Sequence, residues 1–278
     1  MRGSSRRIVA GAALLALLAA ACWFGPWIAG AFGLDATTMR VDRIAEGPSA
    51  AHWMGTDAQG RDLLVRVLIG GRIALGIAAI STALAVVIGT LYGGIAAYAG
   101  GAIDAVMMRV VDVLYGVPTA ALVIVVMATF DSRRLLLLVV LLAATSWLSL
   151  ARVVRAHVRG LRQRDFVLAA HALGASPARI LFRHLLPNSA GLVIVYAAAA
   201  LPQLLVAEAF LSFLGLGVQA PLASLGTLVV EGTAQLLVAP WMLLGPGLVL
   251  SALVLALLLL GDGVRDAVDS QQVSSRVR

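Results

Sequence analysis

The stretch Asp165–Asn188, DFVLAAHALGASPARILFRHLLPN, is a polar, arginine-bearing island between two long apolar stretches of the chain. Its first part, residues 166–173, is rich in Ala and Leu, which favour the α-helix. Gly174 follows this run, at a point where a helix can end in a left-handed backbone conformation at low cost. The sequence therefore predicts a short helix that stops at Gly174.

A second short helix is expected directly after this break. Ser176 is a favoured N-cap, and Pro177 is tolerated at the first helical position because an N–H there would have no helical partner. We expect this helix to cover residues 177–186 and to end at Pro187, which cannot continue it. Residues 165–188, called the knob below, are therefore predicted to form two short helices joined by a turn.

The composition places the chain in a lipid bilayer. Of its 278 residues, 61% are hydrophobic and only 13% are charged, whereas soluble domains carry about 25% charged residues. Such a chain has too little polar surface to cover a globule. All 21 positions counted as lysine or arginine are arginine, so mechanisms that need a lysine, such as a P-loop or a Schiff base, are excluded.

The remaining residue types argue against other functional classes. The net charge of +7 suits nucleic-acid binding, but the arginines lie at the ends of apolar stretches, where they anchor membrane proteins. Cys22 is the only cysteine and the four histidines are scattered, which disfavours a metal site. The sequence Gly215-x-Gly217-x-x-Ala220 does not follow a strand, as a dinucleotide site requires. We expect no catalytic residues, no cofactor, no metal and no nucleic-acid partner.

Six apolar stretches are long enough to cross a bilayer, which takes about 20 helical residues. They predict an all-α, polytopic membrane protein with about six transmembrane helices. Pro118 is expected to bend the third span, and residues 131–134 form a polar turn after it. Gly89-x-x-x-Gly93, followed by Gly94, allows another helix of the same subunit to approach closely. The spans fall within residues 8–34, 73–103, 113–130, 135–151, 189–207 and the second half of 232–261.

The N-terminal apolar stretch allows two interpretations. Arginines precede the uncharged run 8–34, and Ala19-Ala-Ala-Cys22 loosely resembles a lipoprotein cleavage site. The run is longer than the roughly 7 to 15 apolar residues of a secretory signal peptide. We therefore expect a retained first span, which Pro26 should kink or end.

Residues 35–72 are polar and precede the second span. In their last part, residues 61–72, charged side chains alternate with Leu and Val near helical spacing, which indicates an amphipathic helix along the membrane interface. A solvated loop is the alternative. Asp57 and Asp62 are disfavoured as catalytic carboxylates, because nothing near them in the sequence supplies a nucleophile or a metal ligand.

An even number of spans places both termini on one side of the membrane. If that side is the cytoplasm, most of the arginines lie inside, as positive residues do in membrane proteins. The knob is then cytoplasmic as well.

Glu208 is a carboxylate at the end of an apolar stretch, where charge is costly and usually faces protein or a water-filled path. It is a candidate residue of a translocation pathway, and a helix-end anchor at the outer surface is the alternative.

The knob carries a motif of a known family. Its spacing resembles the EAA loop of ABC importer permeases, which docks in a groove of an ATPase subunit. Leu168 stands at the Glu position of that motif and His184 at its Ile position. The matching residues are Ala169, Ala170, Gly174, Leu186 and Pro187.

Two further segments extend this resemblance. Residues 208–217 with Pro221 are similar to a segment of the dipeptide, oligopeptide and nickel branch of these permeases, and residues 55–72 supply a third similarity. Together the three cover roughly Trp53 to Ala267. The resemblance implies the fold of a type I ABC importer permease, also called MetI-like, in a bacterial inner membrane.

The resemblance also implies a function and a division of the chain. The protein is expected to be a transport subunit and not an enzyme, working with a second homologous permease, two ABC ATPase subunits and an extracytoplasmic substrate-binding protein. Dipeptides or oligopeptides are the expected cargo, with nickel and glutathione systems sharing the motifs. The parts are 1–34 with the first helix, an external loop 35–72, a permease core 73–262 with the coupling loop 152–188, and a cytoplasmic tail 263–278.

The ATPase-coupling residues implied by the motif and its turn are Ala169, Ala170, Gly174, Ala175, Ser176, Leu186 and Pro187. Small side chains at the start of the motif suit close approach of a partner. A self-sufficient secondary carrier or channel is the alternative function, but it needs ionisable residues in mid-membrane, and apart from Glu208 the spans hold almost none.

Overall fold

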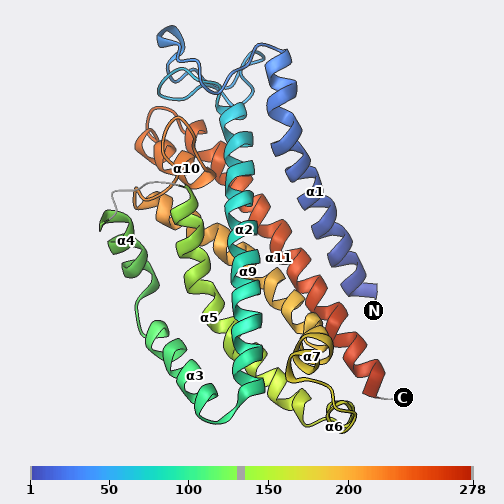
Figure 1. Cartoon of the computed structure of the whole chain (residues 1–278). Coiled ribbons are helices and arrows are strands. Elements are labelled where there is room, and N and C mark those ends of the chain that lie inside the picture. The colour runs from blue at the N-terminus through green and yellow to red at the C-terminus, as the bar shows by residue number, and fades with distance from the viewer. Residues whose placement is uncertain (1, 130–134, 277–278) are drawn as a thin grey trace.

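Long helices that run side by side build an elongated bundle (Figure 1). The computed structural model describes residues 2–129 and 135–276, with the surroundings of the side chains given for residues 6–129 and 135–268. The long helices are α1 (Arg2–Ala31), α2 (Leu63–Ala99), α5 (Leu135–Arg162), α9 (Ala190–Phe213) and α11 (Trp241–Arg276). The shorter elements are η1 (Val41–Arg43), α3 (Gly101–Tyr115), α4 (Thr119–Thr129), α6 (Asp165–Ala172), α7 (Pro177–Ile180), η2 (Leu181–Leu185), α8 (Leu186–Asn188) and α10 (Leu225–Ala234).

Membrane crossing is supported by the length and apolar character of the long helices. Five helices in the described ranges meet both criteria, and α3 with α4 makes a sixth candidate span if the pair is one bent crossing. The axes of α3 and α4 differ by 78°. The third span predicted at 113–130 corresponds to this bent pair, which begins earlier, at Gly101. The predicted bend at Pro118 is confirmed, because proline disfavours helix at the residue before it. The turn expected at 131–134 lies outside the described residues.

Helix α1 continues past the proline that it contains. The sequence predicts that Pro26 kinks or ends the span. It lies inside the helix, which continues to Ala31, so the second of these two alternatives is wrong. Gly11 packs against the backbone of α11, where an added Cβ would lie 2.6 Å from the Leu260 nitrogen. Small residues thus bring α1 directly against α11.

The centre of the bundle is the contact between α2 and α5. An added Cβ at Gly89 would lie 2.9 Å from the Trp147 carbonyl oxygen, and one at Gly93 would lie 2.3 Å from the Ala151 carbonyl oxygen. Both glycines therefore serve packing within the subunit, as their spacing predicts. Leu150 and Ala151, on the facing side of α5, are fully buried.

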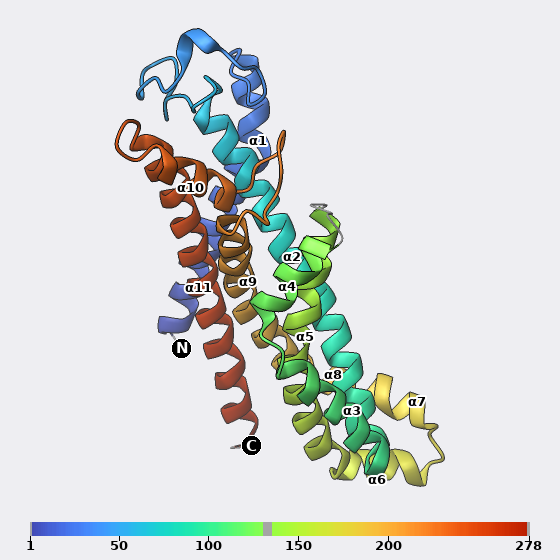
Figure 2. The ribbon, with the colours of Figure 1, turned by 90° about the vertical axis from the view of Figure 1, so that its left-hand side faces the viewer.

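The two ends of the bundle differ in character (Figures 1 and 2). One end, the loop end, carries residues 32–62 and α10. The other end, the knob end, carries α6 and α7, and both termini lie toward it. Helix α11 runs to Arg276, so the tail expected at 263–278 is helical through most of its length.

Candidate functional site

The first half of the knob ends in the way the sequence predicts. Helix α6 is followed by Gly174 with φ +78°, a left-handed conformation that glycine adopts without a Cβ clash. The Gly174 N–H donates to the His171 carbonyl, and the Ala175 N–H donates to the Ala170 carbonyl at 3.0 Å. These two bonds define a Schellman C-cap, which satisfies carbonyls that a helix end otherwise leaves open.

The second half of the knob differs from its prediction. Ser176 does cap α7, since its hydroxyl accepts the Arg179 N–H at 3.4 Å. The helix does not end at Pro187, however. It widens to a π-helical turn at η2 and continues through α8 toward α9.

The π-helical turn explains how the chain passes this proline. Pro187 has no N–H, and its ring would crowd the preceding turn of a regular α-helix. In the wider turn, the Leu186 N–H donates to the Leu181 carbonyl, five residues back. The Asn188 side chain donates to the His184 carbonyl at 2.6 Å, which satisfies that carbonyl.

One face of the knob is anchored in the bundle. Apolar side chains of the knob pack in a buried cluster with α5 and with Ala97 of α2. An added Cβ at Gly94 on α2 would lie 2.7 Å from Leu186, so α2 touches the knob directly. The knob members of the cluster are Val167, Ala170, Ile180, Leu181 and Leu185, each at most 9% exposed. Close packing thus holds the knob against α2 and α5.

The knob also exposes large apolar side chains, next to exposed charged residues such as Arg179 and Arg183. Leu173 is 88% exposed, and Leu168 and Phe182 are each more than half exposed. Exposed large apolar side chains are candidates for contact with another molecule. These three residues, called the apolar face below, were not singled out by the sequence motif, although Leu168 stands at its Glu position.

The residues expected to couple to an ATPase lie on both sides of this knob. Ala170 belongs to the anchoring cluster, and Ala175 and Leu186 are half-buried beside it. An added Cβ at Gly174 would meet nothing within 4 Å, so this glycine serves the backbone turn and not close packing inside the chain. The expected coupling residues with exposed side chains or backbone are Ala169, Gly174, Ser176 and Pro187.

Ion pairs fasten α5 to α3 near the knob. Arg155 donates to both carboxylate oxygens of Asp104, and its second contact measures 2.6 Å. A bidentate pair of this kind fixes geometry as well as charge. Arg152 makes a second link, to Asp112 at 2.8 Å.

The loop end contains a buried charge network that sequence reasoning missed. Arg61 and Arg66 donate to the same Asp57 oxygen at 2.7 and 2.6 Å, and Arg66 also donates to both oxygens of Glu231 on α10. Asp57, Arg61 and Arg66 are each at most 6% exposed. Residues 63–72 form the first turns of α2, so these charges do not lie on a helix along the membrane interface. The i, i+4 spacing of Asp57 and Arg61 was the available signal.

Glu208 lies inside α9, where it is 0% exposed. The expectation of a helix-end anchor at the surface is therefore wrong. The Ser212 hydroxyl donates to Glu208 Oε1 at 2.8 Å and lies 3.2 Å from the Ser224 hydroxyl. Glu208 Oε2 has no hydrogen-bond partner in the described part of the chain. In this conformation Glu208 faces protein, at the junction of α9 with the segment that leads to α10.

The membrane-length helices, with the knob of short helices at one end of the bundle, define an integral membrane protein. Among the described residues, no group of three or more His, Cys, Asp or Glu could hold a metal ion. The chain belongs to the family of binding-protein-dependent transport system inner membrane components, whose family model matches residues 85–273. Members of this family are parts of a transport system, so the protein is one subunit of a transporter complex.

The chain is similar to named proteins over most of its length. It is 39% identical over 256 residues to the oligopeptide transport system permease protein OppC of Haemophilus influenzae, covering 92% of this chain and 80% of that protein. It is 41% identical over 265 residues to OppC of Escherichia coli K12, covering 95% and 87%. It is 42% identical over 223 residues to the dipeptide transport system permease protein DppC of Bacillus subtilis, covering 80% and 69%.

Proposed function

We propose that this protein is the permease subunit of an ATP-driven importer of dipeptides or oligopeptides. The names of its relatives support peptides as the cargo class. The second permease, the two ATPase subunits and the external binding protein belong to the same proposal. So does the orientation, with the knob end and both termini in the cytoplasm and the loop end outside.

The observation that carries this proposal is the two-sided knob. Its buried face is packed onto α2 and α5, and its apolar face is open to a partner. An ATPase that closes around ATP would press on the apolar face. Because the anchored face moves with the helices, the pressure would shift the spans against one another and open the pathway to one side at a time.

A charge placed on the apolar face tests the docking step. In Leu173→Glu, a side chain that is 88% exposed becomes charged without disturbing the core. We expect the tagged variant to lose the ATPase subunit on purification while its helical content stays normal. The matched control is Leu237→Glu in the loop after α10, since Leu237 is 98% exposed at the opposite end. If both variants retain the ATPase equally, the apolar face is not the docking surface.

The turn of the knob tests the coupling step. Gly174→Val places a β-branched residue at φ +78°, where it is strained, whereas Gly174→Asn tolerates that conformation. We expect the Val variant to hydrolyse ATP without peptide uptake and the Asn variant to keep both coupled. Full coupled transport in the Val variant would reject the mechanism.

Uptake assays decide the cargo and the alternative function. Cells that lack this chain should fail to take up labelled dipeptides or oligopeptides, and the wild-type chain should restore uptake only together with its ATPase. Transport by the lone purified chain in liposomes would instead establish a self-sufficient carrier or channel.

A further inference from the structure

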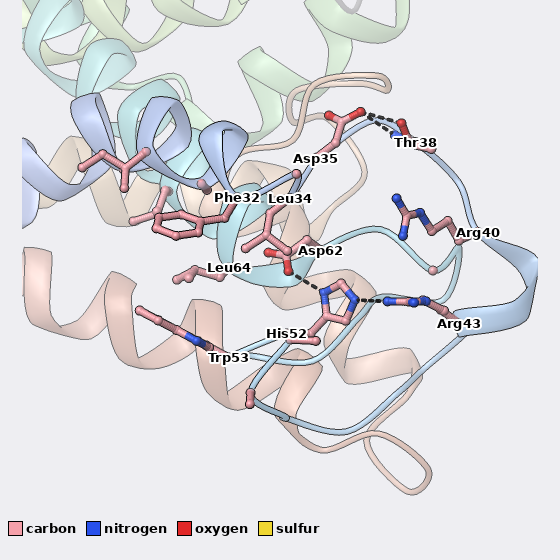
Figure 3. Close-up of a pocket in the computed structure, with 18 of the residues that line it drawn as sticks. Phe32, Leu34, Asp35, Thr38, Arg40, Arg43, His52, Trp53, Asp62 and Leu64 are labelled. Atoms are coloured by element: carbon pink, nitrogen blue, oxygen red, sulfur yellow. Dashed lines mark hydrogen bonds and ion pairs between the residues drawn. The ribbon is translucent and has the colours of Figure 1, made fainter.

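A cavity of about 760 Å³ lies at the loop end, outside the knob and away from the α2–α5 contact. Figure 3 shows the residues that line it. It is bordered by the last turns of α1, by the loop that follows, and by the first turns of α2. Its apolar side includes Ala21, Ile28, Phe32, Leu64 and Leu68. Its polar side includes Asp35, Thr38, Arg40, Arg43 and His52.

The apolar side has the reach of one lipid chain. The α1 residues that line it run from Ala21 to Ala29, which is about 12 Å along the axis at 1.5 Å per residue, and Phe32 follows just after the helix. One leaflet of the hydrocarbon core is about 15 Å thick, half of roughly 30 Å, so the lining stretch of α1 covers most of one leaflet. Trp53, which lines the cavity, is 73% exposed, and exposed tryptophans mark the depth of the membrane–water interface. The cavity therefore spans the zone where lipid head groups meet acyl chains.

The polar side presents two cations. Arg40 is exposed, and within the part of the chain that the structure describes its side chain makes no ion pair or hydrogen bond. Gly60 holds its backbone in place: the Arg40 N–H donates to the Gln59 carbonyl, and an added Cβ at Gly60 would lie 1.9 Å from the Arg40 carbonyl oxygen. Arg43 lies nearby and is held by His52 (Figure 3). Guanidinium groups are suited to bind phosphate oxygens.

His52 adds no charge to this side. Arg43 Nη1 lies 2.9 Å from His52 Nε2, and because arginine can only donate, Nε2 must accept. The other ring nitrogen, Nδ1, then carries the hydrogen that it donates to Asp62 at 2.8 Å. His52 is therefore the neutral tautomer, and it fixes the position of Arg43.

The polar side also presents one exposed carboxylate. Asp35 accepts hydrogen bonds from the hydroxyl and backbone N–H groups of Thr37 and Thr38. These bonds, led by the Thr38 hydroxyl, lower the pKa of Asp35 to about 2, so it is ionised at every physiological pH. A purely anionic head group would lie beside this negative charge. A head group that carries both a phosphate and an ammonium matches the cations and the carboxylate together.

From this combination we propose that the cavity binds one phospholipid with a phosphoethanolamine head group, taken from the leaflet at the loop end. The phosphate lies between Arg40 and Arg43, the ammonium lies beside Asp35, and an acyl chain lies along α1 against Leu64 and Leu68. The lipid thereby fills the space between α1 and the loop that precedes α2.

Native mass spectrometry of the transporter, purified through this chain and stripped of lipid, tests the proposal. Phosphatidylethanolamine, phosphatidylglycerol and diacylglycerol are added back separately. We expect one phosphatidylethanolamine to be retained in preference to the other two. Preferential phosphatidylglycerol binding, or equal retention of diacylglycerol, would overturn the head-group assignment. A bare protein peak with all three would show that protein covers the cavity, and would overturn the site.

Two variants with a matched control sharpen the test. Arg40→Gln should weaken retention about tenfold, the loss typical of one hydrogen bond between charged groups. Asp35→Asn should reduce the preference for phosphatidylethanolamine over phosphatidylglycerol. Arg109→Gln changes an exposed arginine on α3, outside the cavity, and should bind as the wild type does. Equal retention by Arg40→Gln and Arg109→Gln would overturn the proposed role of Arg40 and with it the site.

Discussion

Replacing Asp57 with alanine tests whether the buried charge network holds the loop end together. Asp57 is 1% exposed and binds both Arg61 and Arg66 through one carboxylate oxygen. Without it, the Arg61 side chain, 7% exposed, loses its carboxylate partner while it stays buried. Arg66 keeps Glu231. Removing one partner from a buried ion pair costs about 3–5 kcal/mol, and we expect Asp57→Ala to lower the free energy of unfolding by this amount.

Two control variants test whether the burial of the ion pair, and not its charge alone, determines the loss of stability. Asp42 is 78% exposed and lies 3.9 Å from Arg43, so Asp42→Ala should change stability by at most about 1 kcal/mol. Glu231 is 37% exposed, and solvent screens its pair with Arg66. Glu231→Ala should therefore cost less than Asp57→Ala.

The measurement is a detergent-induced unfolding titration of the purified protein, followed by tryptophan fluorescence. Trp241 is a suitable reporter, because its indole N–H donates to the Thr56 carbonyl at 3.4 Å, next to Asp57. The reasoning is refuted if Asp57→Ala and Asp42→Ala unfold at the same detergent fraction. It is also refuted if Glu231→Ala is the most destabilised of the three, since exposure would then not govern the cost.

Three further predictions follow from packing and charge. Gly93→Ala should destabilise the chain by about 1–3 kcal/mol in the same titration, since its Cβ would lie 2.3 Å from the Ala151 carbonyl oxygen. The control is Gly76→Ala on the same helix, which should be neutral or stabilising because its Cβ would have no atom within 4 Å. Glu208→Gln keeps an oxygen to accept the Ser212 hydroxyl, so we expect normal assembly and wild-type peptide uptake; loss of uptake in a normally assembled variant would instead support a pathway role. The pKa of Asp35 is lowered to about 2. The stabilisation that Asp35 gives to the turn after α1 is therefore fully present above its ordinary pKa of 3.8 and is lost as the pH falls toward 2. In Thr38→Val, which removes one of the hydrogen bonds, the Asp35 pKa measured by NMR should be higher than in the wild type.

The expected class of protein follows from composition and motif, and the comparisons confirm it. A bilayer leaves a mostly apolar chain few options besides helices that satisfy their own backbone groups, so span count and helix content follow from sequence. Local signals were also reliable where one residue decides a local conformation. Gly174 ends α6 and Ser176 caps α7, because both effects act within a few neighbouring residues.

The sequence by itself therefore determined the membrane class, most spans and the turn in the knob. Only the tertiary structure decided what each polar group meets. The helix continues past Pro187 because the Asn188 and Ser189 side chains donate hydrogen bonds to carbonyls of the preceding turn. Arg66 is buried between Asp57 and Glu231, and Glu231 is 165 residues away from it in the sequence. The physical reason is that the free energy of a buried charge or a proline depends on partners from distant parts of the chain, and residue spacing does not reveal those partners.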